Sequence, residues 1–357
     1  MMRVGILTSG GDCQGLNAAI RGVAKALYES FDEIEIYGIS DGYRGLIRGE
    51  YKRMKPEDFS GILTIGGTIL GTSRQPYKLM RVVEEDSVDK VAAMKKTVTK
   101  LRLDCLVIMG GNGTHKTANL LREEGVPVVT LPKTIDNDLW GTDITFGFQS
   151  AVDIAANVID CIHTTATSPG RVFIVELMGH KVGWLALHAG IAGGADIILL
   201  PELPYDLKRV SAALEKRRKQ GKAFSILAVA EGALSRREAK MGKKELAAAR
   251  AAEGYPSVAY RLAAELQDQA GGEVRVCVPG HFQRGGPPCP YDRVLATLLG
   301  AAAAGCIREQ RFGVMCAMVN GQVVPVELEK VAGKLKKVPE DCLEIRMAQE
   351  IGVSFGR

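Results

Sequence analysis

Two aspartates and a lysine stand close together in the sequence, at Lys133, Asp136 and Asp138. A primary alcohol is a poor nucleophile at neutral pH, but a carboxylate can accept its proton. A second carboxylate can hold Mg²⁺, directly or through water, and a lysine can offset the charge on a phosphoryl group in transit. This grouping is typical of phosphoryl transfer to an alcohol. A turn that merely carries solvated acids is the less favoured interpretation.

Two glycine-rich segments could bind the phosphates of a donor. Residues 8–12 read TSGGD and residues 110–114 read GGNGT. Glycines let backbone N–H groups approach a phosphate, and the N-terminus of a following helix adds a favourable dipole. Neither segment has the Walker or the GxGxxG spacing, so each alone could equally be a tight turn between a strand and a helix. Two such segments in one lobe favour a polyphosphate ligand.

Several cationic side chains follow or end expected strands and could hold a phosphate monoester. Arginine binds phosphate in a bidentate manner, so a group of arginines can fix a doubly charged sugar phosphate. Any one of them taken singly is more often a surface residue, and the histidine taken singly would more often be structural. The residues are Arg74, Arg171, Arg275, His281 and Arg284.

The elements that must position these residues are short apolar runs that alternate with helix-like segments. The runs are uninterrupted, which is typical of parallel strands buried on both faces. We therefore expect an α/β fold with two doubly wound lobes and mainly parallel sheets, and an active site at the carboxyl ends of the strands, between the lobes. The expected strands are 4–7, 34–39, 105–109, 126–131, 172–177, 197–200, 224–230 and 274–278, and the clearest helices are 15–28, 116–124, 151–164 and 207–220.

Composition narrows the class of protein. A length of 357 residues suggests two lobes, and 46% hydrophobic with 24% charged residues is ordinary for a globular protein with a core. The net charge of +5 comes from scattered residues, so nucleic acid is not an expected partner. No apolar run is long enough to span a membrane. The eight cysteines include no CxxC pair, which favours reduced thiols in the cytoplasm.

One segment differs in composition from the rest of the chain. Residues 236–254 are rich in Lys, Arg, Glu and Ala. This composition predicts an exposed helical excursion whose charges form a solvated helix face.

Around all these positions the sequence closely resembles the 6-phosphofructokinases. The resemblance covers nearly the whole chain, and so many blocks in family order make it very specific. The shared blocks are TSGGD…GLNAAIRG (8–22), DGYRGL (41–46), GGTILGTSR (66–74), GGNGT (110–114), PKTIDND (132–138), VELMGHKVGW (175–184), AGIAGGAD (189–196), PGHFQRGG (279–286) and PYDR (290–293).

The resemblance implies transfer of a phosphoryl group from Mg²⁺-bound ATP to fructose 6-phosphate. Asp136 would be the general base, with Lys133 and Thr134 beside it, and Asn112 and Asp138 stand where the family binds Mg²⁺. The donor would lie against Gly11, Tyr43, Arg74, Gln75, Gly111, Asn112, Gly113 and Thr114. The sugar phosphate would contact Thr134, Asp136, Arg171, Met178, Gly179, His180, Glu231, Arg275, His281 and Arg284.

The resemblance also implies a division of the chain and an assembly. Residues 1–147 with about 284–333 would form the donor-binding lobe, and residues 148–283 with about 334–357 the fructose 6-phosphate lobe. In the family, Arg171 and Arg275 reach across a subunit interface. A cytoplasmic homodimer or homotetramer with shared active sites is therefore expected, with no nucleic acid and no membrane as partners.

The sequence departs from the family pattern at two positions. Asn112 replaces the aspartate that most members use for magnesium. An amide oxygen can bind Mg²⁺ but adds no charge, so the metal should be held more weakly. His180 replaces an arginine near the reacting phosphate, and we expect Lys133 to take over part of its electrostatic role.

Some alternatives remain open at this point. Lys133 is typical of relatives that use pyrophosphate, whereas Gly113 leaves room for the α-phosphate and nucleoside of ATP, and we favour ATP. A lipid or dinucleotide kinase on a related fold would not need the cations that grip the sugar phosphate. A non-catalytic sugar-phosphate sensor would not need Asp136 together with Asp138 beside that lysine.

Overall fold

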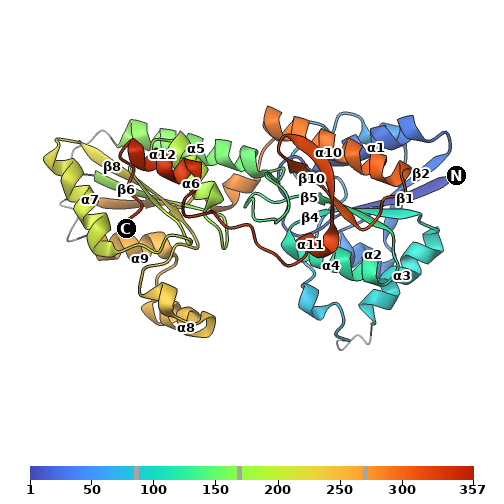
Figure 1. Ribbon diagram of the computed structural model, residues 1–357, viewed down its shortest axis with the longest axis horizontal. Helices are drawn as coiled ribbons and strands as arrows, with labels where there is room; N and C mark the ends of the chain where they lie inside the picture. Colours follow the sequence, from blue (N-terminus) through green and yellow to red (C-terminus); the bar gives the residue numbers. More distant parts are fainter. Residues whose placement is uncertain (84–87, 167–170, 268–271) are drawn as a thin grey trace. The chain divides into compact units, whose positions relative to one another are not determined.

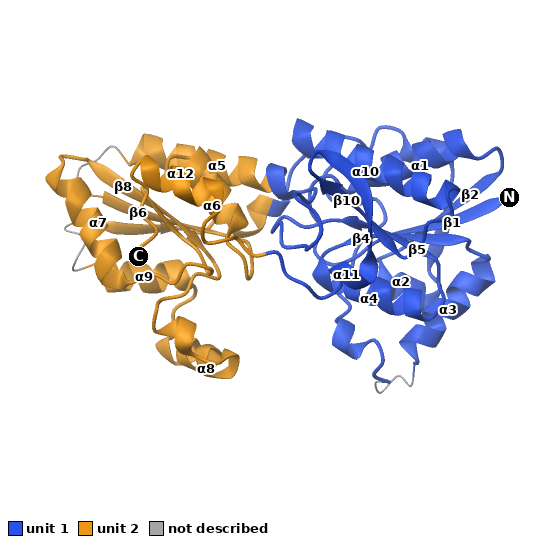
Figure 2. Cartoon of the chain, viewed as in Figure 1, with its two compact units in different colours: residues 1–150, 284–336 blue, residues 151–283, 337–357 orange. Residues whose placement is uncertain are grey.

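A computed structural model of the protein describes residues 1–83, 88–166, 171–267 and 272–357. Contacts divide the chain into two compact units (Figure 2). Unit 1 comprises residues 1–150 and 284–336, and unit 2 comprises residues 151–283 and 337–357. Each unit has its own sheet, and the predicted α/β architecture with mainly parallel sheets is confirmed.

The sheet of unit 1 has seven strands in the order β11-β10-β5-β4-β1-β2-β3. All neighbours are parallel except β3 on β2 and β11 on β10. These two antiparallel strands are partly exposed, so they lack the uninterrupted apolar run that is typical of a buried strand, and they were not predicted. Strand β10 was not predicted either, although its sequence is such a run. The strands are β1 (Met2–Thr8), β2 (Ile34–Ile39), β3 (Tyr51–Met54), β4 (Cys105–Gly110), β5 (Val128–Pro132), β10 (Val314–Val319) and β11 (Gln322–Glu327).

Helices cover both faces of this sheet (Figure 1). In β4, Val107 packs into the cluster that includes α1 and α10, while the next residue, Ile108, packs into the cluster that includes α2, α3 and α4. Burial on both faces explains why β4 reads as a continuous apolar run. The helices are α1 (Leu16–Ser30), α2 (Tyr43–Arg48), η1 (Pro56–Phe59), η2 (Tyr77–Leu79), α3 (Lys90–Leu101), α4 (Asn112–Glu123), α10 (Pro290–Arg308) and α11 (Leu328–Val331).

Unit 2 has a smaller sheet of four parallel strands in the order β7-β8-β6-β9. Helices α7 and α9 cover one face through a shared apolar cluster, and α5, α6 and α12 lie on the other (Figure 1). The strands are β6 (Arg171–Leu177), β7 (Ile197–Leu199), β8 (Phe224–Ala230) and β9 (Val274–Cys277). The helices are α5 (Phe148–Thr165), α6 (Trp184–Ala192), α7 (Leu207–Lys219), η3 (Glu238–Lys240), α8 (Lys243–Glu253), α9 (Val258–Leu266), η4 (Gly280–Arg284) and α12 (Leu343–Glu350).

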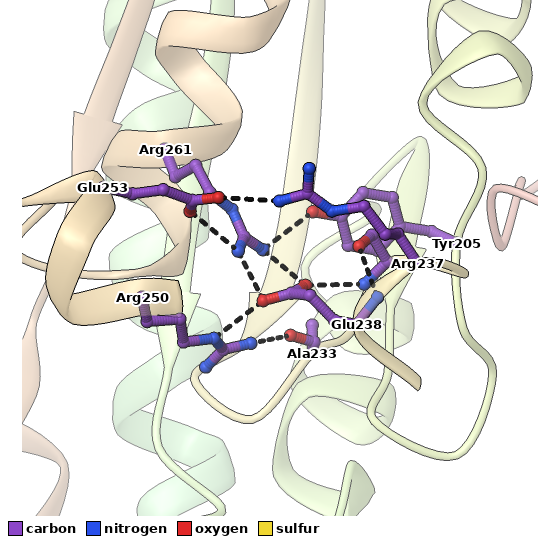
Figure 3. Close-up of polar contacts among 8 residues, drawn as sticks. Tyr205, Ala233, Arg237, Glu238, Arg250, Glu253 and Arg261 are labelled. Carbon is purple, nitrogen blue, oxygen red and sulfur yellow. Dashed lines mark hydrogen bonds and ion pairs between the residues drawn. The ribbon is translucent and has the colours of Figure 1, made fainter. Parts of the chain in front are cut away.

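The segment 236–254 contains an exposed helix, as predicted, but also a buried ion pair that its composition did not predict. Helix α8 buries none of its residues. Just before it, Glu238 is only 3% exposed and accepts hydrogen bonds from Arg261 Nη2 at 2.8 Å and Arg250 Nε at 2.8 Å (Figure 3). The prediction of a wholly solvated charged face is therefore wrong for Glu238, because its partner Arg261 lies outside the segment, on α9.

This ion pair makes a testable contribution to stability. Burial alone would raise the pKa of Glu238, but the hydrogen bonds from Arg261 and Arg250 outweigh it and lower the pKa from 4.5 to about 2. A carboxyl group whose pKa is lowered by folding stabilises the fold fully at a pH above its pKa in the unfolded state. This stabilisation is lost as the pH falls through its pKa in the folded state. We expect Glu238→Gln to lower the free energy of unfolding by about 3 kcal/mol at pH 7, and by less at pH 3.

Urea unfolding of both proteins at the two pH values measures the effect. The control is Glu215→Gln, which breaks an exposed pair with Lys219 on α7 and should cost less than about 1 kcal/mol. A destabilisation by Glu238→Gln that is equally large at pH 3 would show that the ionised carboxylate is not its cause.

Candidate active site

Three neighbouring parallel strands, β1, β4 and β5, end at the same edge of the larger sheet. In the register, Thr8 pairs with Met109 and Gly110 pairs with Pro132. Loops that follow the carboxyl ends of adjacent parallel strands lie next to one another, and ligands bind there in open α/β sheets. These loops are 9–12, 111–114 and 133–138. The fold therefore brings both glycine-rich segments and the acidic segment together.

The first loop is tied to the segment that carries Arg74 and Gln75. Gly10 adopts a positive φ of 90°, which favours glycine, and its N–H donates to Ser73 O at 3.1 Å. Its carbonyl in turn accepts a hydrogen bond from Thr72 Oγ1 at 2.7 Å. These two bonds fix the arginine-bearing segment beside the glycine turn.

Two guanidinium groups flank Gly11. A Cβ at this position would lie 3.0 Å from Arg284 Nη1 and 3.5 Å from Arg74 Nη2, so both guanidinium groups are close to the backbone of Gly11. Arg284 Nη1 also donates to Asp12 O at 3.1 Å. Cations around a glycine turn suit an anionic phosphate. Arg284 thus lies in unit 1 at the expected donor loop, and its contact with the sugar phosphate stays a prediction.

The second loop opens helix α4, whose first turn points its N–H groups towards this edge. Tyr43 is 1% exposed and donates its hydroxyl to Thr114 O at 2.9 Å, so it supports the loop from inside the core. A Cβ at Gly110 would meet Thr114 Oγ1 at 2.3 Å, whereas a Cβ at Gly113 would have nothing within 4 Å. The position of Gly113 is therefore open, with Gly111 and Asn112 beside it.

Lys133 connects the acidic loop with the first glycine loop. Its side chain is 3% exposed, and Nζ donates to Gly11 O. Burial is the largest cause of a lowered pKa for Lys133, and the Arg284 guanidinium lowers it further, whereas Cys13 and Asp136 act in the opposite direction. A buried ammonium group at the glycine turn can act strongly on a phosphate, because little water screens it.

The backbone of the acidic loop is fixed by short polar side chains. Thr134 Oγ1 accepts a hydrogen bond from Asp136 N at 3.1 Å, and Thr145 Oγ1 donates to Thr134 O at 2.8 Å. Asn137 has a positive φ of 52° and accepts a hydrogen bond from Thr145 N at 3.2 Å. Asp136 and Asp138 are both partly exposed at this loop, and the Oδ1 atom of each carboxyl group is buried.

In unit 2, the expected sugar ligands at the ends of β6 and β8 also come together. Glu231 N donates to Leu177 O at 2.8 Å, and Glu231 Oε1 accepts from His180 N at 2.6 Å. Met178 N donates to Gln283 Oε1 at 3.2 Å. Gln283 is buried and was not among the predicted site residues, although it lies in the shared block 279–286. Gly179, with φ of 140°, completes the turn.

A cavity of about 540 Å³ lies beside these residues in unit 2. Its walls include two of the predicted sugar ligands, His180 and Glu231, together with residues of α8, residues that follow α8 and Arg261 of the buried ion pair. They are His180, Glu231, Gly232, Arg250, Glu253, Tyr255, Ser257 and Arg261.

Arg171 and Arg275 lie away from this end of the sheet. Arg171 is the first residue of β6, and Leu177 is the last. At a rise of ~3.3 Å per residue, the two residues lie about 20 Å apart along the strand. Arg275 pairs with Phe173 in the register, and both arginines approach the carboxylate of Glu273, at 3.6 Å and 2.7 Å. Within one chain, the structure does not bring these arginines to the residues after Leu177. His281 is exposed in η4.

The metal candidates sit on the two loops of unit 1. Asn112 Nδ2 donates to Lys334 O at 2.6 Å. The other polar atom of this side chain, Asn112 Oδ1, is an acceptor and can bind a cation. In the described part of the chain, no three His, Cys, Asp or Glu side chains cluster as a metal site. Mg²⁺ is commonly held by one or two carboxylates together with substrate phosphates, so Asp138 and Asn112 fit such an ion.

Comparisons with known proteins agree with this geometry. The phosphofructokinase family profile matches residues 3–307. A protein of Spirochaeta thermophila named ATP-dependent 6-phosphofructokinase is 55% identical over 99% of this chain and 97% of its own length. A protein of the same name from Propionibacterium freudenreichii is 48% identical over 99% of each chain.

A solved structure is similar as well. The phosphofructokinase of Pichia pastoris in the T-state superposes with a TM-score of 0.80 at 31% identity. The match covers 93% of this chain and 35% of that one. With a family profile over most of the residues and relatives that match along their full length, the chain belongs to the phosphofructokinase family.

Proposed function

We propose that the protein is an ATP-dependent 6-phosphofructokinase that converts fructose 6-phosphate to fructose 1,6-bisphosphate. The observation that carries this proposal is the meeting of three loops at the ends of β1, β4 and β5, where Lys133 links the acidic loop to the glycine turn at Gly11. Full-length relatives that carry this name support the same activity and donor.

The residues suggest how the transfer proceeds. Asp136 accepts the proton of the sugar 1-hydroxyl while the oxygen of that hydroxyl attacks the γ-phosphorus of ATP. The bond between the γ-phosphorus and the oxygen that remains on ADP breaks. Lys133 and the N–H groups of Gly11 and Gly111 offset the charge on the transferred group. Asn112 and Asp138 would hold Mg²⁺, which would supply positive charge to the donor phosphates.

The open space at Gly113 supports ATP as the donor, and substitution there tests this. Since a Cβ at this position meets nothing, Gly113→Asp can be accommodated while its carboxylate repels a nearby phosphate. At 4 Å and an effective dielectric constant of 20, this repulsion is about 4 kcal/mol, so kcat/KM for ATP should fall by at least ~10²-fold. The matched control Gly113→Ala should stay within about threefold, because it adds no charge.

Coupled assays with each donor decide between the two activities. We expect the wild-type protein to turn over with ATP and fructose 6-phosphate. Turnover with pyrophosphate and none with ATP would overturn the choice of donor, though not the choice of sugar. No turnover with either donor would overturn the proposed function.

We also propose that the enzyme is a cytoplasmic homodimer or homotetramer in which Arg171 and Arg275 complete the sugar-phosphate site of a neighbouring subunit. Their position at the start of β6 and in β9, away from Met178 and Glu231, supports this assignment. Among the described residues, no helix is both long and apolar enough to cross a bilayer. A fully active preparation with a monomeric mass by light scattering would contradict the shared site.

A further inference from the structure

A short segment at the end of unit 1 contacts two of the three active-site loops. Residues 334–336, here named the linker, follow α11 and are the last of unit 1 before the chain enters unit 2 at Lys337. Lys334 O accepts a hydrogen bond from Asn112 Nδ2 at 2.6 Å, and Leu335 forms an antiparallel bridge with Leu139. The linker therefore joins the start of α4 to the acidic loop.

Lys336 makes the most contacts of the linker with the acidic loop. Its backbone N–H donates to Asp138 O at 2.9 Å. Its Nζ donates to Asn137 Oδ1 at 2.8 Å, to Thr142 O at 2.9 Å and to Asp143 O at 2.8 Å. An ammonium group has three N–H donors, so it can bond to three such oxygens at once.

These bonds act on the residue between the two candidate catalytic acids. Asn137 stands between Asp136 and Asp138, holds a positive φ of 52°, and accepts hydrogen bonds on Oδ1 from both Lys336 Nζ and Thr145 N. Asparagine adopts this left-handed conformation more readily than other non-glycine residues, and the two hydrogen bonds to its Oδ1 hold its side chain in place. The lysine thus ties residue 137 of the acidic loop to residues 142 and 143, which follow that loop.

We propose that Lys336 is a positioning residue, which fixes the acidic loop so that the Asp136 carboxylate is aimed at the sugar hydroxyl. The proposal rests on the proposed function for the identity of that hydroxyl, but the ordering of the loop does not depend on it. Misplacement of a catalytic group by ~1 Å can lower a rate by ~10²-fold, so loss of this lysine should affect kcat more than substrate binding.

The decisive comparison is Lys336→Met against Lys334→Met. Both variants lose one positive charge from the linker, but Lys334 is exposed, and it bonds to Asn112 and Val331 through backbone atoms, which the substitution keeps. We expect Lys336→Met to lower kcat by about 10²-fold with KM for fructose 6-phosphate changed by less than about threefold, and Lys334→Met to behave like the wild type.

A second readout needs no activity. Hydrogen exchange of the ligand-free proteins should show faster exchange of the Asp136 and Thr145 amides in Lys336→Met, and no change in Lys334→Met, because those amides donate within the loop that the lysine holds. If the wild type lacks phosphofructokinase activity, the proposed function fails, and exchange alone decides whether the lysine orders the loop.

Chemical rescue separates positioning from general destabilisation. Propylammonium added to Lys336→Ala should restore part of the lost kcat, whereas the same salt should not affect Lys334→Ala. If Lys336→Ala does not fold, Lys336→Met carries the kinetic and exchange comparisons alone. A Lys336→Met enzyme with wild-type kcat, or with unchanged exchange at both amides, would overturn the proposal.

Discussion

Replacement of Asp136 by asparagine is expected to lower kcat by about 10³-fold while fructose 6-phosphate still binds. The amide keeps the shape of the carboxyl group but cannot accept the proton of the sugar hydroxyl. The loop should keep its conformation, because the backbone N–H of Asp136 donates a hydrogen bond to Thr134 Oγ1, and the substitution does not change this bond. Initial rates with ATP and calorimetric titration with the sugar phosphate measure the two effects separately.

The control is Asp153→Asn, which removes a carboxylate from an exposed position of α5. It should leave kcat within about twofold of the wild type, since exposed substitutions away from a site have little effect. An Asp136→Asn protein with nearly full turnover would remove Asp136 from the mechanism. A wild-type protein that binds the sugar phosphate but never transfers phosphate would instead favour a sensor.

The sequence was sufficient to predict most of the strands that lie inside the sheets, but not β10, an apolar run that lies between β11 and β5. Strands 34–39 and 224–230 were predicted with the bounds that the structure shows, and β4 extends its prediction by one residue. Burial on both faces leaves an uninterrupted apolar signal in such strands. The antiparallel edge strands β3 and β11 lack this signal, because one side of each faces solvent.

Contacts between distant parts of the chain were not predictable in this way. Lys336 is separated from Asn137 by 199 positions, and no local pattern marks the lysine that contacts so distant a loop. Arg261 and its partner Glu238 both belong to residue types that are usually exposed, so composition predicted solvation for the segment that contains Glu238. The glycine turns, by contrast, were recognisable because backbone conformation and close approach restrict them to one residue type.

Loss of the Lys133 ammonium group is the second large effect that the site predicts. Lys133→Met keeps most of the side-chain volume but removes the charge beside Gly11, and we expect kcat to fall by ~10²- to 10³-fold. The reason is electrostatic, since a buried cation at the glycine turn stabilises the transferred group with little competition from water. Steady-state kinetics with ATP, together with a thermal melt, measure the change and check folding.

His180→Arg provides the contrasting variant. The resemblance to the phosphofructokinases implies that His180 replaces an arginine. His180 lies in unit 2, and its backbone N–H donates to Glu231 Oε1. If Lys133 supplies the main positive charge for transfer, an arginine at position 180 should change kcat by no more than about threefold. Small and equal losses in Lys133→Met and His180→Arg would refute this assignment. A large gain from His180→Arg alone would place the missing charge at position 180, and the buried lysine would then serve mainly to hold the carbonyl of Gly11.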